Sequence, residues 1–479
     1  MVNATGKREV VIVGGGVAGI AAFVSAVRNR SVSRIDIVDP RGIGNGIAFA
    51  TTEPALLCNT SVETMSLLDD DPYDFLHYLR AQAMTVSPDA FVPRFLVSRY
   101  LADRYSHYRM LARDADVGHR HFRATARTIE KHPAGGYRVL LDDGTSLQAS
   151  DVVICTGSGA PFLPDALRSH IGAPALFECL YPERRVIEHL PASCRVLVLG
   201  SRLSAVDAAL LACGAGHSVV MASPSGRLPA VRTATPRQCP VEIDEAAIAR
   251  LDLSSPLLYR RLLRQVARSA EGVAGRPLRS QIDRSTYAAE RLARETGLAR
   301  NGATDWQNIL VRYMDLAEQL LRGGTLETRN RALSNCATAV GRYLFALPLE
   351  TAEKLLRYMS EGRLQVKPAV PERLRRDERW RVEWTSGALD SFDVVICATG
   401  FQRQRFHATH DSLALTADPL LPVTAPRVSQ DLRVWLPEAS DPERIWTAGI
   451  ASYLAAPMVN AVYQSVRQAT EITGAWRFS

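Results

Sequence analysis

The sequence predicts an α/β fold with two Rossmann-like lobes, a β-meander and an inserted helical subdomain. Two segments, residues 10–23 and 195–213, each read as an apolar strand, a glycine loop and a helix. A motif is also repeated, because residues 151–157 read DVVICTG and residues 393–400 read DVVICATG. Between residues 242 and 362 the apolar residues recur instead at helical spacing. The 479 residues are enough for about two or three units of roughly 100–200 residues each.

The first lobe is predicted from the N-terminus onward. A strand over residues 9–13 leads into a helix over residues 17–28, and a second strand covers residues 34–38. Alternating residues from 121 to 154 carry a turn at residues 142–144, which is typical of a strand meander. The repeated motif ends this meander, and its second copy follows another meander. Two lobes, each closed by a similar returning strand, would explain the repeat.

The second lobe begins with the strand at residue 195 and continues with a strand over residues 218–222. The helical block that follows is too long for a plain Rossmann unit, so we interpret it as an inserted subdomain on the substrate side of a cleft. Its clearest helices are expected at residues 257–266, 309–321 and 352–359. Strands return near residues 364–366, 380–384 and 393–397, and the chain ends with a strand at 444–448 and a helix at 457–474.

Composition excludes several classes of protein. Hydrophobic residues make up 47% and charged residues 22%, as in ordinary globular enzymes. No apolar run approaches the ~18 residues of a membrane helix, and the polar start of the chain does not resemble a signal peptide. None of the eight cysteines forms a CxxC pair, which argues against a zinc ribbon or a redox dithiol. We therefore expect a cytoplasmic protein with no metal site and no membrane association.

The net charge of +7 comes almost entirely from arginine. These arginines are scattered among acidic residues rather than gathered with aromatic ones, so nucleic-acid binding is not expected. A basic surface still favours anionic small molecules such as dinucleotides. The sequence leaves open whether the chain forms a homo-oligomer.

The first glycine loop reads VVIVGGGVAG over residues 10–19, with Gly14, Gly16 and Gly19 at the G-x-G-x-x-G positions. These glycines allow a tight turn, a close approach of the backbone to a pyrophosphate, and close helix–strand packing. The helix N-terminus then offers unpaired N–H groups to phosphate. Asp39 follows about twenty residues later at a strand end, where it can accept ribose hydroxyls. The loop therefore predicts dinucleotide binding.

The next segment identifies the dinucleotide by resemblance. Residues 44–66 read GNGIAFATTEPALLCNTSVETMS and resemble the segment after the second strand in a large FAD/NAD(P)-binding family of flavoprotein monooxygenases. The matching residues are Gly46, Ala48, Phe49, Pro54, Leu57, Asn59, Met65, Ser66, Asp71, Pro72, Phe75, Leu79, Pro93, Arg94 and Tyr100. The chain is similar to the class B-like members, which include flavin-dependent amine N-hydroxylases. The resemblance covers most of the first ~160 residues and implies FAD in the first lobe.

The resemblance also implies site residues around the flavin. Asn59 would hydrogen-bond the flavin or a substrate, although it could instead cap a local turn. Met65 and Ser66 would line the flavin pocket, with simple packing as the alternative. Ala126, together with its neighbour Thr125, lies where related proteins contact the adenine through the backbone.

Four small residues complete this predicted flavin site. Thr156, Gly157 and Gly400 would end the returning strands near the cofactor, where only small residues allow close approach. Gly449 matches the final flavin-contacting turn of the family.

The second glycine loop, RVLVLGSRLSAVD, is similar to the NADPH loop of class B flavin monooxygenases at Gly200, Leu203, Ser204 and Asp207. It departs from that pattern at Arg202, which replaces the middle glycine, and mildly at Ala205. An arginine Cβ there would obstruct a pyrophosphate unless the loop shifts, or the side chain could swing outward and pair with a phosphate.

The residue that would mark NADPH is also altered. The basic residue usual just after the strand at 218–222 is missing, and Arg227 is a candidate substitute for contact with the 2′-phosphate. NADPH is the favoured second cofactor, while NADH and no functional nicotinamide nucleotide stay open as alternatives.

The helical block offers no catalytic motif, so catalytic residues are not assigned. Gly341, Arg342 and Tyr343 stand where family members often show an H-R-H-R-like stretch. His407 and His410, in the loop after the second repeat, are expected at the surface rather than in catalysis.

These features lead to one favoured function and two alternatives. The favoured function is an FAD-dependent, NAD(P)H-driven monooxygenase that hydroxylates a small molecule, with amine N-hydroxylation in specialised metabolism preferred. The alternatives are an FAD-dependent oxidase or dehydrogenase of an amine or amino acid, and a non-catalytic flavoprotein. The expected domains are FAD-binding over 1–160 and 364–479, NAD(P)H-binding over 161–240, and a helical insertion over 241–363.

Overall fold

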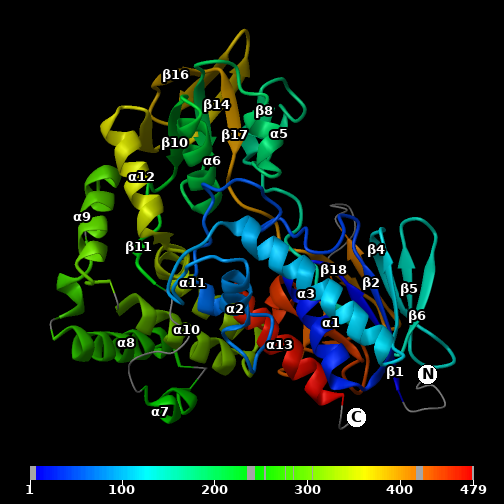
Figure 1. Cartoon of the computed structure of the whole chain (residues 1–479). Helices are drawn as coiled ribbons and strands as arrows, with labels where there is room; N and C mark the ends of the chain where they lie inside the picture. Colours follow the sequence, from blue (N-terminus) through cyan, green and yellow to red (C-terminus); the bar gives the residue numbers. More distant parts are fainter. Residues whose placement is uncertain are drawn as a thin grey trace.

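The computed structural model describes residues 7–234, 243–252, 255–275, 277–283, 285–304, 306–416 and 424–476. Its two β lobes and its helical block are seen apart in Figure 1, with the second lobe at the top, the first at the lower right and the helices at the lower left. The expected boundary at residues 240 and 241, and Cys239, lie outside the described residues.

The first lobe is built on a parallel sheet of five strands in the order β22-β7-β1-β2-β3. Its strands are β1 (Arg8–Val13), β2 (Val32–Val38), β3 (Gly118–Phe122), β7 (Asp151–Ile154) and β22 (Ile445–Thr447). Its helices are α1 (Val17–Asn29), α2 (Asp74–Ala81), α3 (Arg94–Asp114) and α13 (Val462–Ala475), with the 3₁₀ turns η1 (Val62–Thr64) and η4 (Gly449–Leu454). Helix α1 packs between α3 and α13. The central strands are apolar on both faces because helices or the meander cover both sides.

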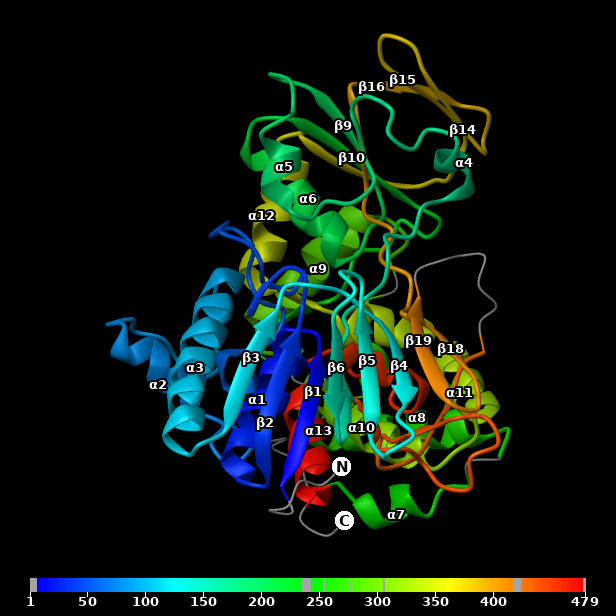
Figure 2. The same cartoon turned by 90° about the vertical axis from the view of Figure 1, so that its right-hand side faces the viewer.

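An antiparallel meander extends the first lobe, in the strand order β18-β19-β4-β5-β6. Its strands are β4 (Ala126–Lys131), β5 (Tyr137–Leu141), β6 (Ser146–Ala149), β18 (Arg405–Ala408) and β19 (Ser412–Thr416). The predicted turn between β5 and β6 is present, and its Gly144 has a φ of +85°. Figure 2 shows these strands beside the parallel sheet.

The second lobe repeats this plan with the parallel order β13-β10-β9-β17-β8. Its strands are β8 (Leu176–Phe177), β9 (Arg195–Leu199), β10 (Ser218–Ser223), β13 (Leu364–Pro368) and β17 (Val394–Cys397), with the meander β14 (Pro371–Arg376), β15 (Trp380–Trp384) and β16 (Leu389–Phe392). Its helices are α4 (Asp165–Arg168), α5 (Glu183–Ile187), α6 (Leu203–Gly214) and α12 (Leu349–Ser360). The two copies of the repeated motif form β7 and β17, which pair with β1 and β9 respectively. The prediction of two similarly closed lobes is confirmed.

The sheet pairing corrects the expected domain division at one point. The sequence predicts that residues 364–397 belong to the first lobe, but β13 pairs with β10 and β17 pairs with β9. The helical insertion lies between β10 and β13, where a simpler lobe has its crossover helix, so the strands after it complete the second sheet. The chain returns to the first lobe with β18.

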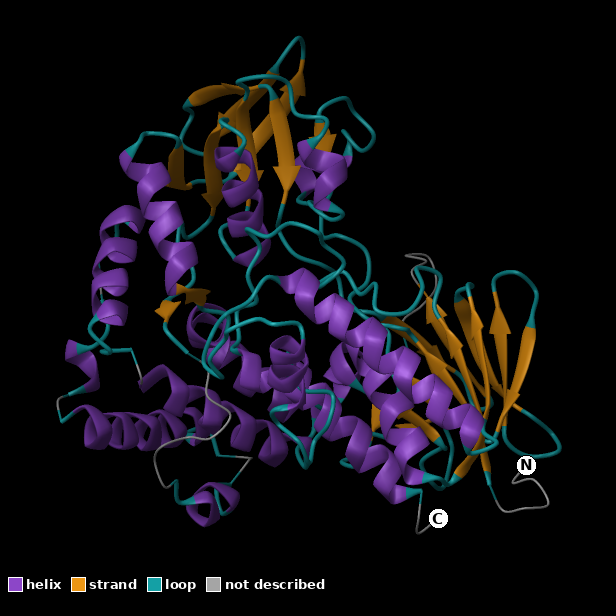
Figure 3. Cartoon of the chain, in the orientation of Figure 1, coloured by secondary structure: helices purple, strands orange, loops and turns teal. Residues whose placement is uncertain are grey.

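The helical insertion forms a layer of its own beside the two lobes, as Figure 3 shows. It contains α7 (Glu245–Ala249), α8 (Leu258–Ala274), η2 (Leu278–Ser280), α9 (Ala288–Arg300), α10 (Trp306–Arg322), α11 (Leu326–Ala339) and the π-helical turn η3 (Val340–Leu344). A two-stranded ladder of β11 (Val231–Arg232) and β12 (Leu347–Pro348) brackets it, and β20 (Arg427–Val428) pairs with β21 (Val434–Trp435) elsewhere. The three helices expected at residues 257–266, 309–321 and 352–359 are confirmed as parts of α8, α10 and α12, although α12 packs against the second lobe rather than lying within the insertion. The fold class predicted from the sequence is therefore confirmed.

Within the described ranges, no helix combines the length and the apolar character that crossing a bilayer requires.

Candidate functional site

The first glycine loop has the backbone geometry that its sequence predicts. Gly14 has a φ of +112°, and a Cβ there would lie 2.5 Å from the carbonyl oxygen of Cys155. A Cβ on Gly19 would collide with the carbonyl of Gly14, so both positions require glycine. Gly16 is the N-cap of α1, and no side chain caps the helix there. The first-turn N–H groups of α1 are therefore available to a phosphate.

Asp39 follows β2 and braces this loop. Its carboxylate accepts hydrogen bonds from the N–H groups of Gly15 at 2.7 Å, Arg41 at 2.7 Å and Gly42 at 3.1 Å. The half-buried carboxylate therefore fixes the glycine loop against the end of the strand. Its predicted contact with a ribose hydroxyl stays a prediction.

The end of β7 offers a polar group beside the loop. The hydroxyl of Thr156 is buried and has no hydrogen-bond partner in the part of the chain that the structure describes. The Thr156 backbone nitrogen would lie 3.2 Å from a Cβ on Gly14, which places the residue against the loop. An orphaned hydroxyl at this point fits a bound dinucleotide, because a buried polar group normally finds a partner.

The other small residues predicted near the cofactor lie in different surroundings. Gly157 and Gly400 border open space, and Gly400 has a φ of +96°. Gly449 contacts the first turn of α1, since a Cβ there would lie 2.7 Å from that of Ala18. Ala126 is buried at the start of β4.

The segment after β2 crosses the glycine loop, because the N–H of Gly44 donates to the carbonyl of Gly15 at 2.9 Å. Farther along, Asn59 and Met65 line a small pocket together with Arg232 and residues from the start of α13. Ser66 does not line that pocket. It is buried, and its hydroxyl is engaged within the local turn by Leu68 and Asp71.

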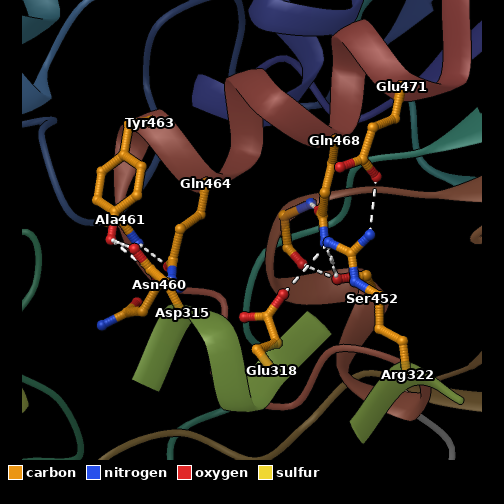
Figure 4. A network of polar contacts seen from close by, with 11 residues as sticks. Asp315, Glu318, Arg322, Ser452, Asn460, Ala461, Tyr463, Gln464, Gln468 and Glu471 are labelled. Atoms are coloured by element: carbon orange, nitrogen blue, oxygen red, sulfur yellow. Dashed lines mark hydrogen bonds and ion pairs between the residues drawn. The ribbon is translucent and has the colours of Figure 1, made fainter. Parts of the chain in front are cut away.

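The wall of this small pocket is held in place from the helical insertion (Figure 4). The Tyr463 hydroxyl donates to Asp315 of α10 at 2.8 Å, and the Gln464 amide donates to the same carboxylate at 2.8 Å. The Gln464 side-chain oxygen accepts from the N–H groups of Asn460 at 2.9 Å and Ala461 at 3.1 Å. Burial raises the pKa of Asp315, while these donors favour its charged form.

The second glycine loop repeats the turn of the first. Gly200 has a φ of +126°, and a Cβ there would collide with the carbonyl of Ala398, as one at Gly14 would with Cys155. The Gly200 N–H donates to Ala222 at 2.7 Å, as the Gly14 N–H donates to Val38 at 2.8 Å. The buried Ala205 stands in the place of Gly19.

Arg202 occupies the position of Gly16 as the N-cap of α6. Its backbone is extended, its side chain is exposed, and its guanidinium lies directly over Gly341 of the π-helical turn η3. The side chain therefore extends from the start of α6 toward η3. Its predicted pairing with a phosphate stays a prediction. Gly341 leaves the space that the guanidinium fills.

A cleft of about 970 Å³ opens on this loop. Among the predicted residues, its lining includes Gly200, Arg202, Ser204, Arg227 and Gly400. The opposite wall comes from η3, and the first lobe contributes Ile450 and Asn460. The cleft thus runs from the second glycine loop to the segment that precedes α13.

Comparison of the lobes reveals a residue that the sequence analysis did not single out. Ser223 ends β10 at the position that Asp39 takes after β2. Its hydroxyl lies 2.8 Å from that of Ser201, and Ser201 also donates to the carbonyl of Arg227 at 2.9 Å. A neutral residue here leaves the ribose position free of the negative charge that would repel a 2′-phosphate. The spacing between the glycine loop and the end of the next strand could have identified Ser223 from the sequence.

A buried ion pair joins the two lobes beside the loops. Arg94 at the start of α3 pairs with Asp207 of α6, and one of its N–H groups lies 3.1 Å from the carboxylate. Tyr181 also donates to Asp207. Burial disfavours the charged guanidinium, but Asp207 outweighs it and the pKa of Arg94 is raised. The sequence analysis found Arg94 and Asp207 as separate motif matches and missed that they meet.

The two histidines considered earlier lie away from the cleft. His407 is in β18 and His410 is exposed in the turn after it. Neither lines any of the cavities described above.

Comparisons with known proteins agree with this arrangement. Residues 11–159 match the family described as FAD-NAD(P)-binding, so this part of the chain is an FAD/NAD(P)-binding domain. The sequence matches none of the curated proteins. The resemblance predicted from residues 44–66 is confirmed at the level of this domain.

Two solved structures share the fold over nearly the whole chain. The ornithine hydroxylase from Pseudomonas aeruginosa is 16% identical with a TM-score of 0.57, and 98% of each chain is covered. The L-lysine 6-monooxygenase from Pseudomonas syringae is 16% identical with a TM-score of 0.59, covering 98% of this chain and 99% of that one. The chain therefore has the fold of these two enzymes.

Proposed function

We propose that the chain is an FAD-dependent monooxygenase, driven by NAD(P)H, that hydroxylates a small molecule in specialised metabolism, with the nitrogen of an amine as the favoured acceptor. The observation that carries this proposal is the pairing of two dinucleotide loops in repeated lobes, with one cleft reaching from the second loop to the first lobe. The fold shared with an ornithine hydroxylase and a lysine 6-monooxygenase supports the same reaction class.

The first lobe would hold FAD. Gly14 and Gly16 shape the loop, the open first turn of α1 faces the pyrophosphate, and Asp39 stands at the ribose position. The orphaned Thr156 hydroxyl is available to a phosphate or ribose oxygen. Bound FAD would supply electron transfer and the activation of O₂, and the protein would supply orientation and an enclosed pocket.

The second lobe would hold the nicotinamide nucleotide. The open N-terminus of α6 and the Ser204 side chain face the cleft, with Arg202 and Arg227 as cations on its wall. Arginine pairs well with phosphate oxygens because its planar fork offers parallel N–H donors. The neutral Ser223 favours NADPH over NADH.

The substrate would reach the pocket lined by Asn59 and Met65, close to where the cleft meets Asn460. Asn59 can orient a polar group of the substrate, and the Asp315–Gln464 network keeps the opposite wall rigid. Oxygen transfer to a nucleophilic amine requires no acid or base from the protein. The proposal therefore does not depend on a catalytic side-chain constellation.

A second candidate is an oxidase or dehydrogenase that takes hydride from an amine or amino acid. Arg202 favours it, because a large side chain replaces the glycine that lets the backbone approach a pyrophosphate. The absence of any CxxC pair in the sequence argues against a third activity, dithiol reduction.

Anaerobic stopped-flow mixing separates these activities. The FAD-loaded protein is mixed with NADPH, NADH or candidate amines while flavin absorbance is followed, and oxygen is added afterwards. Bleaching by NADPH, followed by hydroxylamine formation with an added amine, is expected. Bleaching by an amine alone, with no response to either nucleotide, would replace the monooxygenase with the oxidase.

A further inference from the structure

The helical insertion contains an apolar cavity of about 60 Å³ between α8, α10 and α11. Aliphatic side chains form most of its lining, among them Leu262, Val266, Leu310 and Met314. The hydroxyl of Tyr313, which also borders the cavity, lies 2.9 Å from the hydroxyl of Ser269 and is therefore satisfied. The cavity thus presents mainly carbon to its occupant.

The cavity exists because α11 approaches its neighbours with small residues. Ala332, Cys336 and Ala339 lie one to two turns apart on the face that borders the cavity. The start of α11 is fixed by a polar contact instead, since the buried Arg329 donates to backbone carbonyls of Leu321 and Arg322. Protein interiors are normally close-packed, so an unfilled apolar space sacrifices contacts that an apolar ligand would restore.

Met458 connects this cavity to the candidate site. Its side chain lines the apolar cavity, the dinucleotide cleft and the small pocket of Asn59 and Met65. Leu333 of α11 likewise borders both the apolar cavity and the cleft. A ligand whose reacting end lies in the small pocket therefore has the apolar cavity as its neighbouring space, separated by a flexible methionine.

From this arrangement we infer that the substrate carries a small apolar group, and that the cavity between α8, α10 and α11 binds this group with Met458 at the entrance. The inference rests on the proposed function, because it takes the small pocket as the place of reaction. At about 10–15 Å³ for each water-sized group, the cavity accepts roughly four to six non-hydrogen atoms, the size of a short alkyl chain or a phenyl ring. It is too small for a helix of another protein. An ammonium end would lose its hydration there, and the lining, among the described residues, includes the cation Arg331 but no carboxylate to pair with it.

Calorimetric titration of the oxidised, FAD-loaded protein with straight-chain primary amines from propylamine to octylamine tests this inference. The Kd is expected to fall about fourfold for each added methylene until the cavity is full, near five or six carbons, and then to level off. Diaminopentane, which carries a second charge at the far end, is expected to bind at least about tenfold more weakly than pentylamine. Equal affinities along the series would overturn the inference.

Two variants locate the binding site. Ala332→Leu and, independently, Cys336→Leu fill the cavity and are expected to abolish the fall in Kd along the amine series. Ala289→Leu is the matched control, because Ala289 is exposed on α9 and outside the cavity lining. A chain-length dependence that survives in both filled variants, with folding verified by circular dichroism and FAD content, would place the apolar group elsewhere.

This measurement needs no turnover, so the two proposals can fail separately. If the alkyl series behaves as expected while NADPH leaves the flavin oxidised, the cavity assignment stands and the monooxygenase proposal fails. If NADPH reduces the flavin and amines are hydroxylated without regard to chain length, the function stands and the cavity assignment fails.

Discussion

The two glycine loops have the same backbone conformation and differ in the residues that would contact a ligand. Gly14 and Gly200 both have positive φ angles and both face a strand carbonyl that a Cβ would strike. The second glycine position of the motif differs, with Gly16 in the first lobe and Arg202 in the second. The glycine that makes the turn is therefore required by the fold in both lobes, whereas the residue that caps the helix differs between them.

The strand ends differ in the same way. Asp39 braces the first loop through the N–H of Gly15, whereas Ser223 approaches the second loop through the hydroxyl of Ser201. A carboxylate at this place suits ribose hydroxyls, and a neutral hydroxyl suits a ribose that carries a phosphate. The comparison teaches that the lobes repeat one structural unit and differ in the residues at the positions where a nucleotide would bind.

The largest effect is expected from the shared turn. Gly14→Ala should raise the Kd of FAD by about a hundredfold or more, because the strained φ and the Cys155 carbonyl force the loop to move. Gly200→Ala should leave FAD bound and abolish reduction by NADPH. The ratio of flavin to protein absorbance and an NADPH titration measure the two outcomes. Gly272→Ala, in open space on α8, serves as the control. Loss of FAD in both loop variants would contradict the assignment of FAD to the first loop and NADPH to the second.

A smaller effect is expected from giving the end of β10 the same residue that follows β2, an aspartate. Ser223→Asp should raise the Kd of NADPH by about tenfold to a hundredfold while changing that of NADH little, because the new carboxylate repels only the 2′-phosphate. Stopped-flow titration of the rate of flavin reduction with each nucleotide measures the ratio. Ser360→Asp adds the same charge at the exposed end of α12 and should change neither value. An unchanged preference for NADPH over NADH would show that Ser223 does not lie beside the ribose of the bound nucleotide.

Arg202 tests whether the departure in the second loop aids or hinders binding. If its guanidinium pairs with a phosphate, Arg202→Ala should raise the Kd of NADPH by about tenfold, as expected for an exposed charged hydrogen bond. Gly341→Ala should displace the guanidinium in the native background and have little effect once Arg202 is alanine. Arg260→Ala on the exposed face of α8 is the control. Tighter NADPH binding by Arg202→Ala would instead show that the arginine obstructs the nucleotide, as the oxidase alternative requires.

Sequence reasoning reached the features that depend on local spacing. It predicted both glycine loops, the repeated closing strands and the long helices of the insertion, since each is written in a short stretch of residues. It placed residues 364–397 in the wrong sheet, because strand pairing across a long insertion is a tertiary choice. The contacts of Arg202 with Gly341 and of Arg94 with Asp207 also join distant segments, and nothing local signals them.

The same limit applies to the joint between the first lobe and the insertion, where the smallest effect is expected. Glu318 of α10 is buried beside Asp315 and Arg322, and Arg322 reaches Glu471 of α13 at 2.7 Å (Figure 4). Burial, with a contribution from Asp315, raises the pKa of Glu318 to about 7, although Arg322 and Arg467 oppose the shift. The spacing of these residues in the sequence does not predict that α10 and α13 make this contact.

A raised carboxyl pKa gives a definite sign to the pH dependence of stability. The folded protein holds the Glu318 proton up to about pH 7, whereas the unfolded chain releases it near its ordinary value of 4.5, so this group's stabilising contribution is lost as the pH rises between the two. Glu318→Gln should therefore match the native protein near pH 5, apart from its lost Arg322 contact, and gain about 1–3 °C in relative Tm by pH 8. Differential scanning fluorimetry across this range measures the difference. Glu327→Gln, exposed on α11, should follow the native curve throughout. A Glu318→Gln difference that is constant with pH would show that Glu318 is already ionised at pH 5, held by Arg322 and joining the first lobe to the insertion as a permanent ion pair.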